Sequence, residues 1–183
     1  MPILKIARLG HPVLLRKAAA IDDPADPQLH RLVHDMVDTL DDAGGVGLAA
    51  PQIHVSSRVI IYLVPASRMG DLDTEDVPLT AVLNPVLTPI GTEKELGWEG
   101  CLSIPGMRGA VPRWRRVRLT GQALDGSPID TAASGFHARV LQHEVDHLDG
   151  ILYPMRMNDL SLLAYKEEWQ RYLADAELRE TGE

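Results

Sequence analysis

The segment His143-Glu144-Val145-Asp146-His147 has two histidines four residues apart. On a helix these positions share one face, so both imidazoles can reach the same metal ion. Glu144 lies beside that face and can accept a proton from water that a bound metal has made acidic. The alternative is a chance match on an exposed helix, which random composition would give in about one chain in a hundred of this size. The pattern therefore predicts a catalytic metal site.

A tetrahedral catalytic site needs a third protein ligand and one open position. The sequence has a single cysteine, Cys101, which cannot form an internal disulfide. The preceding Gly100 predicts a bend in which the backbone can approach a metal and its substrate closely. A lone cysteine is more often a small buried apolar residue than a ligand. Beside an otherwise incomplete pair of histidines, however, we interpret Cys101 as the third ligand.

Three segments resemble the signature motifs of the peptide deformylases, in the same order and at plausible separations. They are GVGLAAPQ at residues 45–52, EGCLS at 99–103 and QHEVDH at 142–147. Residues 6–14, IARLGHPVL, also resemble the opening of that family. The resemblance extends to about residue 154, and it implies an enzyme that hydrolyses the formyl group from the N-terminal formyl-methionine of new polypeptides.

The resemblance also implies roles for individual residues. In that family the metal is held by the cysteine of the second motif and by both histidines of the third. The general acid and base is the glutamate of the third motif, here Glu144. The developing negative charge on the formyl oxygen is stabilised by a glutamine and a backbone N–H group, here those of Gln52 and Leu102. The family's usual metal is Fe²⁺, and Zn²⁺, Ni²⁺ or Co²⁺ can substitute for it.

The substrate backbone is expected to lie along the protein in the manner of an added strand. The residues that the resemblance places beside it are Val46, Gly47, Gly100 and Arg108. The methionine side chain needs a narrow apolar pocket, for which we expect side chains from Val46, Trp98, Phe136 and Val140. Arg139, one turn before His143, stands where many members carry an aliphatic residue, which affects the depth and polarity of this pocket.

Two other functions are compatible with parts of the pattern. A zinc endopeptidase could use the same two-histidine helix, but such enzymes usually take their third ligand from a downstream Glu, His or Asp. A structural metal clip in a binding module would normally have four protein ligands. We find three convincing ligands, and Glu144 and Gln52 have no task in a structural site.

The elements that position these residues can be predicted from periodicity. Apolar residues at helical spacing predict helices over 27–42, 134–147 and 160–178. Apolar and β-branched runs predict strands at 58–64, 79–84 and 86–90, and residues 111–129 predict a hairpin with Asp125-Gly126 at its turn. We interpret residues 46–52 and 65–78 as loops. Strands grouped between helices favour an α+β fold, with mainly antiparallel short sheets around a central metal-binding helix, an N-terminal helix and a C-terminal helix.

Length and composition limit the remaining possibilities. The 183 residues, 45% of them hydrophobic, indicate a single catalytic domain over 1–183. No apolar run approaches the roughly 20 residues of a membrane-spanning helix, and a signal-peptide pattern is absent, so we expect no membrane partner and a cytoplasmic, bacterial location. An organellar origin, with a transit peptide already removed, stays open.

The charge limits the partners in the same way. The formal net charge of −8 argues against broad nucleic-acid binding and against specific DNA recognition, and any ribosome contact would be transient and local. In related proteins the C-terminal end can help to dock on the ribosome, whereas here we expect its helix to serve in packing. Five arginines nevertheless cluster at positions 108, 113, 115, 116 and 118. We expect the exposed face of a hairpin, where arginines pair with acids across strands. A surface for peptide carboxylates or ribosomal RNA is the alternative.

Overall fold

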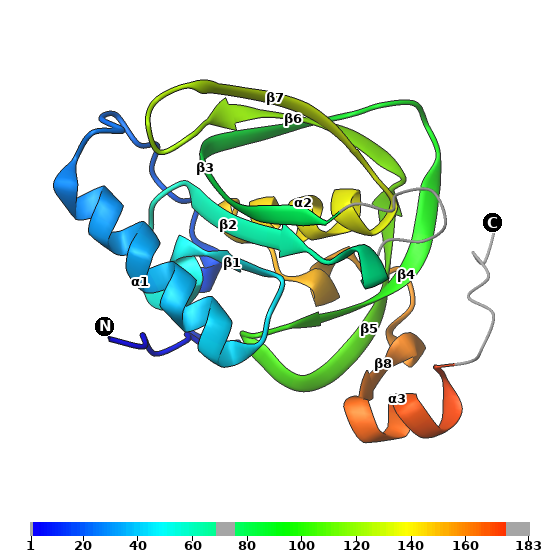
Figure 1. The fold of residues 1–183 in the computed structure, drawn as a ribbon. Coiled ribbons are helices and arrows are strands. Elements are labelled where there is room, and N and C mark those ends of the chain that lie inside the picture. Colours follow the sequence, from blue (N-terminus) through cyan, green and yellow to red (C-terminus); the bar gives the residue numbers. More distant parts are fainter. Residues whose placement is uncertain (1, 69–75, 175–183) are drawn as a thin grey trace.

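The computed structural model describes residues 2–68 and 76–174 (Figure 1). Its α-helices are α1 (Pro27–Ala43), α2 (Gly135–Leu148) and α3 (Lys166–Tyr172). Its strands are β1 (Gly47–Ala49), β2 (Val59–Val64), β3 (Val77–Pro89), β4 (Lys94–Cys101), β5 (Ile104–Trp114), β6 (Arg116–Gln122), β7 (Pro128–Ser134) and β8 (Leu163–Tyr165). Short 3-10 helices occupy Pro12–Leu15, Ala50–Ile53, Ala66–Arg68, Tyr153–Arg156 and Leu160–Leu162. The fold is α+β, as predicted.

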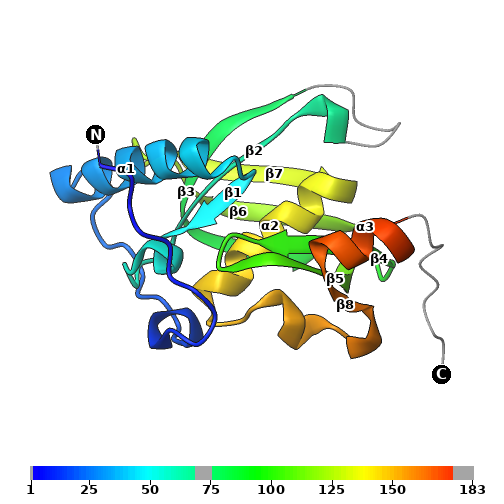
Figure 2. The ribbon, with the colours of Figure 1, turned by 90° about the horizontal axis from the view of Figure 1, so that it is seen from below.

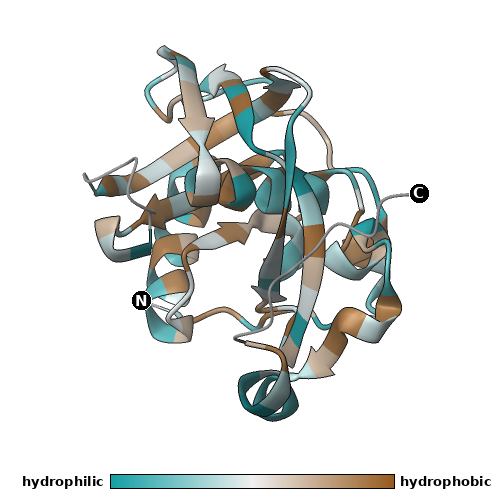
Figure 3. Ribbon diagram, turned by 90° about the vertical axis from the view of Figure 1, so that its right-hand side faces the viewer, coloured by the Kyte–Doolittle hydropathy of each residue, from teal (hydrophilic) through white to brown (hydrophobic). Residues whose placement is uncertain are grey.

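Two antiparallel sheets make up the β structure. The larger has the strand order β1-β2-β3-β6-β7, and the smaller has the order β4-β5-β8. Hydrophobic and hydrophilic residues follow one another along many strands (Figure 3). In β6, for example, Val117 and Leu119 are buried while Arg116 and Arg118 are exposed. This alternation is what a sheet with one buried face requires.

Helix α2 packs between the two sheets, and it touches strands of both (Figure 1). Most of its residues are buried, including the polar Gln142, Glu144, Asp146 and His147. Its apolar residues, such as Leu141 and Leu148, join the core formed by the larger sheet. A buried helix that carries this many polar groups needs partners for them inside the protein. Gln142 finds them in the backbone of Trp114 and Asp146 in the side chain of Arg113, whereas Glu144 and His147 lie at the candidate site.

Helix α1 covers the β1–β2 end of the larger sheet, and its boundaries follow from the sequence. The Asp26 side chain accepts a hydrogen bond from the Gln28 N–H, and Pro27 occupies the first turn. At the other end Gly44 adopts φ +64°, the left-handed conformation common after a helix. Leu29, Val33, Met36 and Leu40 are buried against β1 and β2. The predicted helix over 27–42 is thus confirmed.

Several predicted elements were wrong in type or extent. Residues 47–49 form the short edge strand β1 and not a loop, because they pair with β2 in register. The two strands predicted over 79–90 are one strand, β3, interrupted by a register shift between Leu83 and Val86. The predicted hairpin is β6 and β7, whereas residues 111–114 belong to β5 in the other sheet.

The C-terminal prediction was wrong at its start. A helix was expected from residue 160, but residues 160–165 form a 3-10 turn followed by β8, and α3 begins at Lys166. Pairing of β8 with β5 replaces the first turns of the predicted helix. Residues 175–178 of that prediction, and residues 69–75 of the predicted surface loop, lie outside the described residues.

Among the described residues, none of the helices combines the length and the apolar character that crossing a membrane requires.

Candidate metal centre and active site

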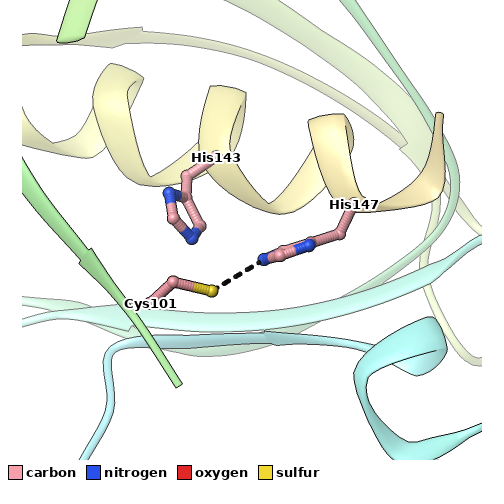
Figure 4. Close-up of side chains that lie close together, drawn as sticks. All are labelled: Cys101, His143 and His147. Atoms are coloured by element: carbon pink, nitrogen blue, oxygen red, sulfur yellow. Dashed lines mark hydrogen bonds between the residues drawn. The ribbon is translucent and has the colours of Figure 1, made fainter. Parts of the chain in front are cut away.

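The structure brings together Cys101, His143 and His147, the three predicted metal ligands (Figure 4). Their donor atoms all lie within 4.8 Å of one another, and Cys101 Sγ is 3.3 Å from His147 Nε2. Burial alone would raise the pKa of the Cys101 thiol, but the imidazoles of His147 and His143 hold it well below its usual value. A thiolate and two imidazoles that face one point form a donor set suited to a divalent transition metal.

Two elements deliver these ligands. The histidines lie one turn apart on α2, as the i, i+4 spacing predicts, and their ring centroids are 5.0 Å apart. Cys101 is the last residue of β4, not part of an open bend. The β4–β5 register shifts between Glu99 and Cys101, so Gly100 lies in a bulge. Bulges commonly redirect a side chain next to a functional site, and this one lies beside α2's histidines.

Glu144 lies next to these ligands in a dry environment. Its side chain is 4% exposed, and Oε2 is buried without a hydrogen-bond partner among the described residues. Burial raises the pKa of Glu144 to about 7, although the imidazoles of His143 and His147 oppose the shift. Gly47 packs against this carboxylate so closely that a Cβ there would overlap Oε1. The glycine thus leaves the space that Glu144 occupies.

Gln52 is oriented by a hydrogen bond at its own amide oxygen. The Ala49 N–H donates to Gln52 Oε1 at 2.8 Å, which leaves the Nε2 group to point the other way. Nε2 donates to Ser103 Oγ at 3.2 Å and approaches Cys101 Sγ at 3.6 Å. A buried amide N–H donor is therefore fixed at the edge of the metal centre.

A group of buried ion pairs holds the His143 ring in place through its Nδ1 atom. The His143 Nδ1–H donates to Glu99 Oε2 at 2.8 Å, and Arg113 donates to both Glu99 oxygens at 2.9 and 3.1 Å. Burial alone would raise the pKa of Glu99, but the hydrogen bonds from His143 and Arg113 hold it well below its usual value. Arg113 also donates to Asp146 on α2 at 2.5 Å. Such outer contacts fix the ring orientation of a metal-binding histidine.

Arg139 adds a further cation to this group. Its guanidinium donates to Glu99 Oε1 and to the carbonyl oxygens of Glu95, Gly97 and Val111. A Cβ at Gly97 would lie only 2.7 Å from Arg139 Nη2, so the glycine allows this close packing. Arg139 is thus bound to the backbone of β4 and β5 and clamps the smaller sheet to α2.

Replacing Arg113 with methionine is expected to lower the free energy of unfolding by about 3 kcal/mol, the lower end of the range for breaking a buried ion pair, because Glu99 keeps Arg139 and Asp146 keeps Arg156. Urea unfolding of the metal-free protein measures this change. Arg118→Met is the matched control, since the Arg118–Asp130 pair is exposed and its loss should leave the unfolding midpoint nearly unchanged. Equal, small effects of the two substitutions would contradict the structural importance of the buried group.

The metal centre opens into a groove of about 600 Å³. Val46, Trp98, Phe136 and Val140, the four residues expected around a methionine side chain, all line it. So do Gly47, Gln52, Gly100, Leu102 and Arg108, which the sequence also placed at the site. A larger hollow of about 970 Å³ lies elsewhere, but it contains none of the three ligands. We therefore place the reaction in the smaller groove.

The arginine cluster is only partly what the sequence predicted. Arg118 pairs with Asp130 across β6 and β7 on an exposed face, as expected. Arg113 is 5% exposed and belongs to the buried group, which contradicts the prediction for that residue. Arg108 lies at the groove, where its guanidinium occupies the space that a Cβ at Gly100 would fill. Its partner there is its neighbour's backbone, since Nη1 donates to the Met107 carbonyl at 3.1 Å.

Comparison with known proteins agrees with this geometry. The model of the polypeptide deformylase family matches residues 3–162. The chain belongs to the polypeptide deformylase family. It is 52% identical over 166 residues to peptide deformylase 1 of Nitrosomonas europaea, which covers 91% of this chain and 92% of the relative. Peptide deformylase 2 of Ralstonia nicotianae is 48% identical with the same coverage.

A solved deformylase structure shows a similar fold. The Met-Ala-Ser-bound class I type b peptide deformylase of Acinetobacter baumannii superposes with a TM-score of 0.78 at 37% identity, covering 85% of this chain and 99% of that one. This deformylase chain is accordingly a metal-dependent amidohydrolase that removes the N-terminal formyl group from new polypeptides. The Cys101, His143 and His147 cluster fits a divalent metal.

Sequence reasoning assigned no role to Glu99 or Ser103, and it placed Arg113 on the exposed face of a hairpin. Glu99 and Arg113 had a usable signal, because alternate residues of a strand share a face. Glu99 is two residues before Cys101, and Arg113 is two after the buried Val111. Ser103, which accepts the hydrogen bond from Gln52, lies in the turn between β4 and β5, where no such period applies.

Proposed function

We propose that Cys101, His143 and His147 hold the catalytic metal of this deformylase, and that Glu144 carries the protons of the reaction. The observation that supports this most strongly is the position of a buried, unpartnered carboxylate oxygen next to three convergent ligands. Three protein ligands leave a fourth position free, as a catalytic centre requires and a structural clip does not. When bound, the metal supplies Lewis acidity that polarises the formyl carbonyl and makes water acidic.

Glu144 acts as general base and then as general acid. It first accepts a proton from the attacking water, whose oxygen bonds to the formyl carbon. The carbon–nitrogen bond then breaks, and Glu144 returns the proton to the leaving amine while formate departs. The Oε2 of Glu144, unpartnered among the described residues, suits both steps, because this oxygen is free to take up and release one proton in each turnover.

Gln52 and Leu102 stabilise the negative charge that develops on the formyl oxygen. The amide of Gln52 faces Cys101, and the backbone N–H of Leu102 follows the same cysteine in the chain. Donors that are already fixed lose no energy to reorganisation when this charge appears. Hydrolysis is accelerated when these donors stabilise the transition state more than they stabilise the bound substrate.

The substrate backbone lies along the groove between Val46 and Gly47 on one side and Gly100 and Arg108 on the other. These residues belong to, or directly precede, the strands β1, β4 and β5, and all of them line the groove. An extended peptide can therefore pair with strand backbone at either side. The related Acinetobacter deformylase binds Met-Ala-Ser, the product of deformylating such a peptide.

Iron is the metal we propose, with Zn²⁺, Ni²⁺ and Co²⁺ as substitutes. The donor set of one thiolate and two imidazoles accepts all four ions, so the support for Fe²⁺ comes from resemblance to the family. Activity that is high after anaerobic purification and is lost in air would support iron. Activity that is insensitive to air would favour one of the other ions.

The proposed setting is the bacterial cytoplasm, with formyl-methionine chains as substrates and a transient ribosome contact. The named relatives are bacterial deformylases. We also propose that residues 1–183 act as a single catalytic domain, since α2 contacts strands of both sheets.

The reaction is tested by measuring formate released from formyl-Met-Ala-Ser under anaerobic conditions. Acetyl-Met-Ala-Ser is the control, because its acyl carbon carries a methyl group that the narrow site should exclude. We expect formate from the first peptide and negligible acetate from the second. Cleavage of internal peptide bonds, with no formate release, would instead favour a zinc endopeptidase.

A further inference from the structure

The C-terminal segment 163–172 contributes Lys166 to the lining of the groove, although it lies beyond residue 162, where the match to the family model ends. Strand β8 extends the smaller sheet, with Arg108 opposite Ala164 and Met107 opposite Tyr165. Helix α3 follows at once and lies against β5 (Figure 2). Because β5 also carries Arg108, this pairing places α3 beside the groove.

Trp169 of α3 contacts both Trp98 of β4 and Arg108 of β5. Its ring centroid is 6.0 Å from that of Trp98, which lines the groove, and the two rings meet edge to face. The Arg108 guanidinium lies 5.9 Å from the centroid of the Trp169 ring. Aromatic pairs and cation–π contacts at these distances are attractive. Trp169 therefore positions both Trp98 and Arg108 from outside the groove.

The same segment adds a further cation to a groove already lined by Arg108 and the exposed Arg68. Lys166, the first residue of α3, is exposed and lines it. Within residues 2–68 and 76–174, neither Lys166 nor Arg108 forms an ion pair with a carboxylate. The acidic residues in the lining are Glu99 and Glu144, which are both buried. Glu167 and Glu168 follow Lys166 but do not line the groove.

Three cations that line the groove, Arg68, Arg108 and Lys166, have no carboxylate partner among the described residues, which is notable in a chain of net charge −8. The rest of the protein repels acidic peptides, whereas this rim attracts them locally. A charge on the rim of a binding site mainly affects recognition and association, and it leaves the chemical step unchanged.

We propose that α3, held against the smaller sheet through β8, adds Lys166 to the rim of the substrate groove, where Lys166 and Arg108 favour peptides with an acidic side chain after the formyl-methionine. The inference rests on the proposed function, since it assumes that the peptide leaves the metal centre along this groove. Lys166 contacts the acidic side chain directly, and Trp169 acts as a positioning residue behind Trp98 and Arg108.

The test compares kcat and KM for amidated formyl-Met-Glu-Ser and formyl-Met-Ala-Glu with their lysine counterparts at low salt. For at least one of the two positions, the kcat/KM of the wild-type protein should be about fivefold higher for the glutamate peptide than for its lysine counterpart. This is the size expected for an exposed charge pair. The preference should appear in KM, because these contacts bind the substrate and the transition state alike. It should fade as added salt screens the charges.

Lys166→Glu should remove or reverse the preference, and Lys166→Arg should retain it. Arg116→Glu is the matched control, because it makes the same charge change at an exposed residue that does not line the groove. It should keep the wild-type ratio. Equal kcat/KM for glutamate and lysine peptides at both positions, with formate still released, would overturn this inference and leave the proposed function intact. Absence of formate from every peptide would overturn both.

Discussion

Glu144→Gln should retain its metal but release formate at least about a hundredfold more slowly than the wild-type protein, because loss of a general acid and base typically costs 10²–10⁴ in rate. Glutamine has nearly the same shape as glutamate, so the packing against Gly47 should survive. The amide cannot accept the proton of the attacking water. Formate release from formyl-Met-Ala-Ser and metal content, measured on the same sample, report this result.

The loss should appear in kcat more than in KM, since Glu144 is proposed to act on the chemical step. Glu93→Gln is a suitable control, because Glu93 is an exposed carboxylate whose side chain retains 74% of its accessible surface. It should behave like the wild-type protein. A Glu144→Gln variant with metal bound and with nearly unchanged kcat would contradict the assigned role.

Cys101→Ala should abolish both stable metal binding and formate release. Removal of an outer partner of a metal ligand already costs about 10–100-fold in affinity, and loss of a ligand should cost more. The methyl group is smaller than the thiol and should leave the β4–β5 turn intact. Metal content after dialysis and formate release, both measured anaerobically, test the expectation.

His34→Ala provides a control for general effects of removing a possible metal-binding side chain, because His34 lies on α1 outside the groove and should not alter metal content. The decisive contrary result is a Cys101→Ala protein that keeps its metal and cleaves internal peptide bonds. That outcome would remove Cys101 from the site and favour the endopeptidase alternative.

The convergence of Cys101, His143 and His147 could be predicted, because the two histidines depend only on local spacing. The i, i+4 histidines need only a helix, and α2 forms over nearly the predicted residues. A single cysteine leaves no ambiguity about which thiol is available. Gly47 and Gly100 also marked the site in the sequence. In the structure they allow Glu144 and Arg108 to pack closely against the backbone, and they do not belong to an open loop.

The support behind the ligands depends on contacts between distant segments and was therefore missed. Glu99, Arg113 and Asp146 lie on β4, β5 and α2, and alternation along a strand shows which residues share a face but not what covers that face. Arg139 was considered as part of an apolar pocket, yet most of its hydrogen bonds go to strand carbonyls. Burial of these charges becomes apparent only when the smaller sheet is packed on α2.

The end of the chain shows the same limit for secondary structure. Leu162, Tyr165 and Trp169 fit a helical stripe, and the propensity of this region alone would extend α3 backwards. Residues 163–165 instead form β8, because they pair with the edge of β5 that β4 leaves open. Pairing between residues that lie far apart in the sequence, such as Arg108 and Ala164, decides this element, and local periodicity carries no information about it.

The most direct test of the central claim is a titration of the metal-free protein with Co²⁺ under anaerobic conditions, following formate release and thiolate-to-cobalt absorption together. We expect both signals to rise in parallel and to reach a plateau at one ion per chain. Activity without added metal, or activity that saturates with no thiolate absorption, would show that the reaction does not take place at the Cys101, His143 and His147 site.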